Sequence, residues 1–187
     1  ARTPASERAR LLNAIADEID NQIETMAKAE SVDNGKPISL ARVVDIPRAS
    51  LNFRFFASAI TSFSSESHAM EDSAINYTLR QPIGLVGCIS PWNLPLYLFT
   101  WKIAPALASG NCVIGKPSEI TPMTAYLLSE ICMDVGLPAG VLNIIHGYGN
   151  KVGSAMSGHP EIPVISFTGG TSTGKRIAEA AAPHFKK

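Results

Sequence analysis

The sequence predicts an α/β protein with a parallel sheet that is covered by helices on both faces. From residue 75 onward, short apolar segments alternate with amphipathic helical patterns, as in consecutive β-α-β units. Most of these segments are apolar throughout, which is typical of strands that are buried on both faces of a sheet. Polar or glycine-rich turns follow the strands, at the positions where such sheets bind ligands.

Two helices are predicted before this region. Apolar residues at helical spacing indicate a helix that begins near Ser6 and ends at the Asn-Gly-Lys-Pro turn, residues 34–37. A second helix is predicted over residues 38–60, with a kink at Pro47 because proline interrupts the helical hydrogen bonds. We expect both helices to pack against the sheet.

The remaining elements complete the alternation. Residues 62–73 are polar and predict a loop, and residues 75–80 alternate as a strand does. Further strands are predicted at 86–89, 112–114, 141–145 and 164–167, and helices at 96–107, 123–135, 152–156 and 171–182. Because the carboxyl ends of parallel strands meet at one edge, a ligand crevice is expected there. The loops expected to form it are residues 90–93, 116–119, 146–150 and 168–174.

The composition argues against several classes of function. The chain has 187 residues, of which 45% are hydrophobic and 17% charged, as in an ordinary globular protein. The 16 Lys and Arg residues balance 16 Asp and Glu residues, so no basic excess indicates nucleic acid or a membrane surface. No apolar run approaches the ~20 residues of a membrane span. We therefore expect neither a nucleic-acid nor a membrane partner.

The cysteines indicate neither a disulfide framework nor a metal site. Cys88, Cys112 and Cys132 are an odd number without a C-x-x-C pair, and each lies in an apolar run. We expect them to be buried small hydrophobic residues, with no metal bound. A reducing, cytoplasmic location fits this pattern.

A glycine-rich turn joins the last predicted strand to the last predicted helix. In Gly169-Gly-Thr-Ser-Thr-Gly-Lys175, backbone amides and a helix N-terminus are suited to bind a phosphate group. Arg176 stands where a nucleoside triphosphatase needs a magnesium-binding hydroxyl, and the turn follows the fourth strand rather than the first. That class and a purely structural turn remain alternatives. The run from Gly147 to Gly153 resembles a dinucleotide-binding pattern but is one residue too long.

Two more loops carry polar groups at strand ends. Lys116-Pro-Ser-Glu119 offers a cation and a carboxylate; the carboxylate suits ribose hydroxyls and would repel a 2′-phosphate. The alternative is a solvated helix N-terminus. Asn93 lies between Pro91 and Pro95, which restrict the backbone on either side, so its amide is suited to stabilise a developing oxyanion. The alternative is that Asn93 caps the following helix.

Together these motifs closely resemble the aldehyde dehydrogenase superfamily. The resemblance rests on segments in the order and spacing of that family: Ser90–Pro95, Trp101-Lys102, Ala104–Asn111, Lys116–Glu119, Gly140–Asn143 and Phe167–Gly174. Asp45–Arg48 and Asn52–Ala57 are similar to the branch of the family that acts on aminomuconic or hydroxymuconic semialdehydes.

The resemblance implies a Rossmann-like domain that binds NAD in preference to NADP. It assigns the cofactor contacts to Ile89, Ser90, Trp92, Lys116, Ser118, Glu119, Gly149, Gly153, Thr168, Gly169, Gly170, Thr171, Thr173 and Gly174. Many members carry a serine at the position of Gly170. Asn93 would supply the oxyanion-hole amide, Lys102 would assist proton transfer, and Trp101 would line the aldehyde channel.

The resemblance also implies an enzyme longer than this chain. The family's nucleophilic cysteine and water-activating glutamate are expected beyond Lys187, and the apolar surroundings of the present cysteines make them poor substitutes. We expect residues 1–74 to be the helical part of the cofactor domain and residues 75–187 its NAD-binding part, with the catalytic domain outside both. The alternative is a catalytically silent nucleotide-binding or interaction module.

The expected reaction is NAD-dependent oxidation of a small aldehyde, of the muconic semialdehyde type, by a homodimer or homotetramer. Such a substrate carries a carboxylate that an arginine can bind through two hydrogen bonds. Arg48 and Arg54 are the candidates. The alternative is that both are surface or interhelical residues.

Overall fold

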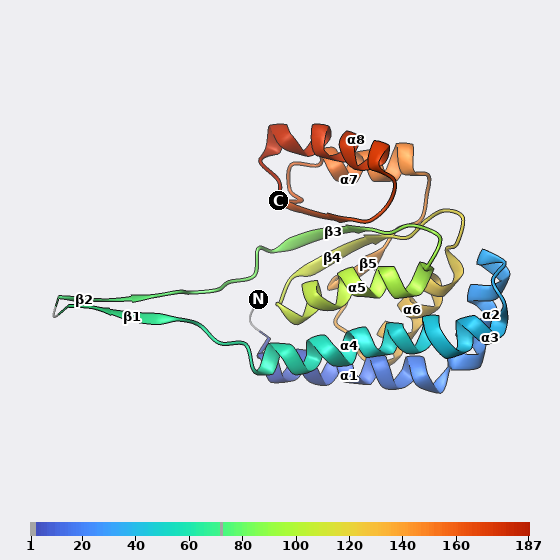
Figure 1. Cartoon of the computed structure of the whole chain (residues 1–187), viewed down its shortest axis with the longest axis horizontal. Helices are drawn as coiled ribbons and strands as arrows, with labels where there is room; N and C mark the ends of the chain where they lie inside the picture. Colours follow the sequence, from blue (N-terminus) through green and yellow to red (C-terminus); the bar gives the residue numbers. More distant parts are fainter. Residues whose placement is uncertain (1–2, 72) are drawn as a thin grey trace.

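A parallel sheet lies at the centre of the computed structural model, which describes residues 3–71 and 73–187 (Figure 1). The sheet has four strands in the order β5-β4-β3-β6. All three pairings are parallel, so the carboxyl ends of the strands share one edge. The strands are β3 (Leu85–Ile89), β4 (Cys112–Lys116), β5 (Leu142–Ile144) and β6 (Val164–Phe167). The predicted α/β class with a parallel sheet is confirmed.

Helices cover both faces of the sheet, as predicted (Figure 1). On one face lie α5 (Pro95–Ala108) and α6 (Met123–Asp134), with α1 (Ala5–Asn21) and α4 (Ile46–Thr61) packed behind them. On the other face lie α7 (Ser154–Gly158) and α8 (Thr171–Ala181). The π-helical turn η2 (Gly149–Gly153) leads into α7, and the short 3-10 turn η3 (Ala182–His184) follows α8.

The hydrophobic core is divided by the sheet into two unequal parts. The larger cluster joins α1, α4, α5 and α6 to the sheet and includes the fully buried Phe53, Phe99 and Ile103. A Cβ added to Gly115 would stand 2.6 Å from Phe99 Cζ, so glycine in β4 lets α5 approach the sheet closely. On the α7–α8 face, the buried hydrophobic cluster is smaller and consists of Ile89, Met156 and Ile162.

The N-terminal helix differs from the prediction because it is broken at Gln22. α1 ends at Asn21 and α2 (Ile23–Asn34) begins after Gln22, whose backbone leaves the helical region at φ −101° and ψ 20°. The side-chain amides of Asn21 and Gln22 both donate to the Glu18 carboxylate. The break reorients α2, which buries Met26 and Ala27 in the larger core.

The second predicted helix is irregular before Pro47 rather than at it. A short α3 (Ile38–Leu40) is followed by the π-helical turn η1 (Ala41–Asp45), and α4 then begins at Ile46. Because Pro47 has no amide hydrogen, it cannot donate to the carbonyl oxygen four residues earlier, and a wider π-helical turn precedes it. The predicted irregularity is therefore present but lies at residues 41–45, before Pro47, and the proline stays its predicted cause.

The prediction of a loop at residues 62–73 is wrong, because part of it is a strand. β1 (Ser67–Met70) pairs antiparallel with β2 (Ala74–Tyr77), and their hairpin projects away from the body of the molecule (Figure 1). All residues of both strands are exposed, so backbone pairing, rather than burial of a side-chain pattern, defines them. The predicted strand at 75–80 is correspondingly shorter. Among residues 3–71 and 73–187, no helix is both long and apolar enough to cross a membrane.

Candidate functional site at the carboxyl edge of the sheet

The loops that follow the strands meet at one edge of the sheet. β3 lies between β4 and β6, and the Thr168 amide donates to the Ile89 carbonyl oxygen at 3.2 Å. The loop after β5 reaches the loop after β4, since the Gly149 amide donates to Glu119 Oε1 at 3.4 Å. The predicted convergence of these loops is confirmed.

A groove of about 250 Å³ opens at this edge, between α8 and the η2–α7 segment. Four residues that the sequence predicts as cofactor contacts line it: Ile89, Gly149, Gly153 and Thr173. Sequence reasoning missed the other lining residues, which are Asn150, Ser154, Ser157, Arg176, Ile177 and Ala180. A signal for Arg176 was present, because it follows Thr173 by three positions and so shares its helix face. The groove therefore combines a glycine-rich wall with a cationic one.

The glycine-rich turn places the N-terminus of α8 beside this groove. Gly170 is extended at φ −69° and ψ 146°, and its carbonyl accepts the amides of Thr173 and Gly174. The first amides of a helix have no acceptor within the helix, so those of Thr171 and the next residue are suited to an anion. A Cβ at Gly169 would stand 2.5 Å from Phe167 Cζ, whereas one at Gly170 would meet nothing within 4 Å. Space for a ligand group thus lies at Gly170.

Lys116 and Glu119 form an ion pair at the end of β4. The buried Lys116 Nζ donates to Glu119 Oε2 at 3.0 Å and to the Pro117 carbonyl oxygen at 2.9 Å. Burial acts to raise the pKa of the Glu119 carboxyl. Hydrogen bonds from its own amide, Lys116 and the Gly149 amide, with the charge of Lys116, outweigh burial and hold that pKa below its usual range. Glu119 is therefore an exposed, ionised acceptor at the rim of the crevice.

Two buried serines flank this edge, and they differ in their bonding. Ser118 Oγ accepts the Ile120 amide at 3.3 Å. Ser90 Oγ, directly after β3, has no hydrogen-bond partner among the described residues. Ser90 directly follows Ile89, which lines the groove, but the Ser90 side chain is buried and is not among the lining residues.

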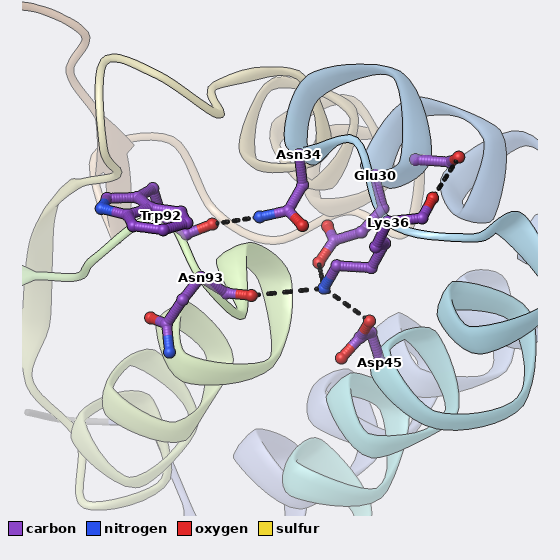
Figure 2. Close-up of polar contacts among 7 residues, drawn as sticks. Glu30, Asn34, Lys36, Asp45, Trp92 and Asn93 are labelled. Carbon is purple, nitrogen blue, oxygen red and sulfur yellow. Dashed lines mark hydrogen bonds and ion pairs between the residues drawn. The ribbon is translucent and has the colours of Figure 1, made fainter.

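Asn93 does not cap the following helix. α5 begins at Pro95, its cap residue is Leu94, and no side chain makes a cap hydrogen bond there. The Asn93 side chain is exposed and points away from the polar cluster that contacts its backbone, as Figure 2 shows. The helix-cap alternative is therefore wrong, and the amide group is available to a ligand. Trp92, the preceding residue, is 53% exposed.

Lys102 lies in α5 below the same edge and is buried. Its ammonium group donates to Oγ1 of Thr168, the residue that directly follows β6. Burial lowers the pKa of Lys102, because the charged form is poorly solvated there, although the nearby Cys88 acts in the opposite direction. A lysine with a lowered pKa exchanges a proton more readily near neutral pH.

An aromatic cluster on α4 and α5 surrounds Trp101. Its ring lies 6.1 Å from that of Tyr97 and 6.4 Å from that of Phe56, each in an edge-to-face arrangement. The Arg48 guanidinium stacks over Tyr97 at 5.4 Å and is exposed. Arg54 instead bridges α4 to α1, with 2.6 Å contacts to both Asp17 and Asp20. These contacts favour the interhelical alternative for Arg54 and leave Arg48 as the available arginine.

The buried cysteines are unsuited to nucleophilic attack. Burial raises the pKa of Cys88 to about 12 and that of Cys132 to about 12, with Lys102 acting weakly in the other direction on Cys88. Cys112 is partly exposed. Within the part of the chain that the structure describes, no three His, Cys, Asp or Glu side chains gather where they could hold a metal ion. The cytoplasmic location stays a prediction.

Comparison with known proteins identifies the family of this arrangement. The family model described as "Aldehyde dehydrogenase family" matches residues 1–187. The chain belongs to the aldehyde dehydrogenase family. The 2-aminomuconic semialdehyde dehydrogenase of Homo sapiens is 52% identical over 100% of this chain, which spans 38% of that relative. The 2-hydroxymuconic semialdehyde dehydrogenase of Pseudomonas sp. (strain CF600) is 48% identical over 95% of this chain, which spans 37% of that relative.

The solved structures show the same architecture. An aldehyde dehydrogenase from Bacillus cereus, solved as an NAD+ complex, superposes with a TM-score of 0.97 and 36% sequence identity. The match covers 99% of this chain and 38% of that one. The aldehyde dehydrogenase fold predicted from the sequence motifs is therefore confirmed, for a chain that spans well under half the length of these relatives.

Proposed function

We propose that this chain forms the NAD-binding part of an NAD-dependent semialdehyde dehydrogenase. The observation that carries the proposal is the groove at the carboxyl edge of the sheet, beside the N-terminus of α8. It is lined by four of the predicted cofactor contacts, Ile89, Gly149, Gly153 and Thr173. When bound, NAD accepts a hydride from the substrate carbon. The residues present fit such a cofactor, because they supply both phosphate donors and a ribose acceptor.

The cofactor residues divide into two groups in this proposal. Glu119, held by Lys116, accepts the hydroxyls of the adenosine ribose, and the close approach of Gly149 leaves room for the adenine. The pyrophosphate binds at the N-terminus of α8 beside Gly170. Ile89 and Trp92 contact the cofactor from the end of β3. The remaining contacts are assigned to Ser118, Gly153, Thr168, Gly169, Thr171, Thr173 and Gly174.

The chemistry assigned to this chain is stabilisation of charge and movement of protons. The exposed amide of Asn93 donates to the oxyanion that forms as the aldehyde carbonyl is attacked. Lys102, with its lowered pKa and its bond to Thr168, assists proton transfer. The attacking thiol and the water-activating carboxylate belong to another part of the protein, since Cys88 and Cys132 are buried and stay protonated.

The substrate proposed is a semialdehyde of the muconic type, in line with the activities named for the two relatives. Trp101 and its aromatic neighbours offer an apolar wall, and Arg48 offers a cation for the distal carboxylate. Arg54 has no part in this proposal, because it is already paired with two aspartates.

The chain is proposed to work within a homodimer or homotetramer. The β1–β2 hairpin exposes Met70, Ile75 and Tyr77, which are apolar side chains that a partner subunit would cover. Residues 1–74 and 75–187 are proposed to act as one cofactor-binding unit, because α1 and α4 share a core with α5 and the sheet.

Cofactor titration of the Glu119→Gln variant tests this proposal. Loss of the carboxylate removes the ribose acceptor and the repulsion of a 2′-phosphate, so the preference measured by the two Kd values should shift toward NADP about tenfold. Glu130→Gln on α6, whose carboxylate accepts the Tyr126 hydroxyl, is the matched control and should leave the preference unchanged. An unchanged preference in Glu119→Gln would contradict the assigned role.

A second candidate function is a catalytically silent nucleotide-binding module. The burial of Cys88 and Cys132 favours it for these residues taken alone. An assay of the 187 residues alone does not separate the two functions, because NAD binding without NADH formation from a semialdehyde fits both. The separating assay uses the longer protein. NADH formation by the longer protein then selects the enzyme, and its absence selects the module.

A further inference from the structure

The turn between α2 and α3 contacts the backbone of the loop that carries Asn93. Asn34 Nδ2 donates to the Trp92 carbonyl oxygen at 2.7 Å, and Lys36 Nζ donates to the Asn93 carbonyl oxygen at 3.4 Å (Figure 2). The paired residues are 58 and 57 positions apart in the chain. From the sequence, this turn is expected only to end a helix.

Two buried carboxylates hold Lys36 in place. Its ammonium group lies 2.6 Å from Asp45 Oδ2 and 3.5 Å from Glu30 Oε1. Glu30 and Asp45 are 0% and 1% exposed, and the Lys36 side chain is 8% exposed. A lysine ammonium has three donors, and the third is directed to Asn93. Acceptors from α2, η1 and the loop thus determine the position of the cation.

The contacts fix the direction of the Asn93 side chain through its two peptide planes. The Trp92 carbonyl belongs to the plane before the Asn93 Cα, and the Asn93 carbonyl belongs to the plane after it. Because each plane is rigid, anchoring both oxygens restricts φ and ψ of Asn93 and hence the direction of its Cα–Cβ bond. Pro91 and Pro95 fix only their own φ angles, so they leave this direction undetermined.

The turn itself is built to present both donors. Gly35 adopts the left-handed conformation, with φ +78°, which reverses the chain between Asn34 and Lys36. Ser31 Oγ donates to the Lys36 carbonyl oxygen at 2.7 Å. Asp33, in the last turn of α2, instead accepts the Met123 amide with its Oδ2 at 2.7 Å, which attaches this end of α2 to α6.

We propose that Asn34 and Lys36 are positioning residues for Asn93, through which the N-terminal helices control the oxyanion-binding amide. The inference rests on the proposed function, because it assumes that Asn93 contacts the reacting oxygen. It adds a role for the buried Lys36–Glu30–Asp45 cluster, which lies outside the cofactor groove and contributes no group to it.

The test uses the full-length protein with Asn34→Ala, Lys36→Met and Asn93→Ala variants, and with Asp33→Asn as the control from the same end of α2. We expect Lys36→Met to lower kcat about 100-fold and Asn34→Ala about tenfold, since small misplacement of a catalytic donor has effects of this size. The Kd of NAD should change much less than kcat, because the groove is separate and only Trp92 of the proposed cofactor contacts is hydrogen-bonded to this turn. Asp33→Asn should leave kcat unchanged.

Two further measurements distinguish positioning from general destabilisation. Amide hydrogen exchange at residues 92–94 should rise in Asn34→Ala and Lys36→Met, while the amides of β3 stay protected. Adding Asn34→Ala to Asn93→Ala should lower kcat no further, because a positioning residue has no effect once the amide that it positions is gone.

The outcomes separate the two proposals. A normal kcat in Asn93→Ala overturns the proposed oxyanion role itself. A lowered kcat in Asn93→Ala beside normal values in Asn34→Ala and Lys36→Met overturns the positioning inference alone, as do additive losses in the double variant. If Lys36→Met fails to fold because its carboxylates lose their cation, Asn34→Ala decides the question, since Asn34 is only partly buried.

Discussion

The two faces of the sheet differ in how completely they are covered. The face toward α5 is closed by a second layer of helices and buries large side chains such as Phe53 and Phe99 completely. The face toward α8 is covered by one layer, and α8 itself buries a single residue, Ala181, among its described positions. The groove lies on this thinner face.

The two faces contribute to the proposed site in different ways: one holds the Asn93 loop in place, and the other carries the groove. The closed face holds the loop that carries Asn93 through Lys36 and its buried partners, so that loop is tied to the most tightly packed part of the molecule. The thinner face carries a smaller hydrophobic cluster and leaves the groove and the first backbone amides of α8 open to a ligand. In the proposed function, the group that stabilises the oxyanion and the surface that binds the cofactor would thus lie on opposite sides of one sheet.

The largest expected effect tests the packing difference itself. Phe99→Ala on the closed face should lower the free energy of unfolding by about 3–5 kcal/mol, because it leaves a cavity under Gly115. Ile177→Ala on the partly buried face of α8 should cost only about 1 kcal/mol. Urea unfolding measures both. Equal losses of unfolding free energy at the two positions would contradict the difference in packing between the two faces.

The second prediction concerns the thiols of the closed face. With a pKa of about 12, only ~10⁻⁴ of Cys88 or Cys132 is thiolate at pH 8, so iodoacetamide should leave both unmodified in the native protein. The partly exposed Cys112 is the internal control and should react first. Peptide mapping by mass spectrometry checks the order. Early modification of Cys88 would show that this face opens.

The third prediction sharpens the comparison through pH. Burial, the largest influence, raises the pKa of Glu30 above its usual 4.5; Lys36 and a hydrogen bond from Thr124 oppose it, and the Asp45 carboxylate raises it further. The folded protein therefore holds this proton more tightly than the unfolded chain does. The protonated Glu30 carboxyl therefore contributes to stability fully below its pKa in the unfolded chain. This contribution is lost as the pH rises through its pKa in the folded protein.

Glu30→Gln removes this titration while Lys36 keeps its 2.6 Å contact to Asp45. The stability of the variant relative to the wild type should therefore rise from pH 4.5 upward and level off above the folded pKa of Glu30. Urea unfolding across this pH range measures the difference. Glu7→Gln is the control of opposite sign, because a hydrogen bond from Arg10 lowers the pKa of that exposed carboxyl. A relative stability that falls with pH in Glu30→Gln would contradict the assignment.

The smallest effect is expected on the open face. A side chain at Gly170 meets nothing within 4 Å and occupies the cap position of α8, so Gly170→Ser should raise the free energy of unfolding by ~0.3 kcal/mol. Its hydroxyl adds a donor at the proposed pyrophosphate site, and the Kd of NAD should fall a few-fold. Gly169→Ser is the matched contrast, since its Cβ would stand 2.5 Å from Phe167 Cζ. Calorimetry measures the stability and the Kd of NAD for both variants. Equal values in the two variants would contradict this description of the edge.

Much of the site could be predicted because its signals are local. The glycines before α8, the Lys116–Glu119 pair and the two prolines around Asn93 each occupy a few consecutive residues, and each restricts the backbone or supplies charge within that span. Gly149 and Gly153, also chosen from a local pattern, line the groove. The hairpin strand β1 escapes prediction, because its exposed side chains give no pattern of burial to detect.

The amino-acid sequence alone established the α/β class, the order of the elements and the edge of the sheet that carries the polar loops. These depend on periodicity and on proline and glycine, which act over short stretches of chain. The packed molecule was needed to show which side chain reaches the Asn93 loop, and that Arg54 is paired with Asp17 and Asp20. The reason is that a buried ion cluster is formed by residues from separate elements. The desolvation that requires its pairing exists only once those elements have packed together.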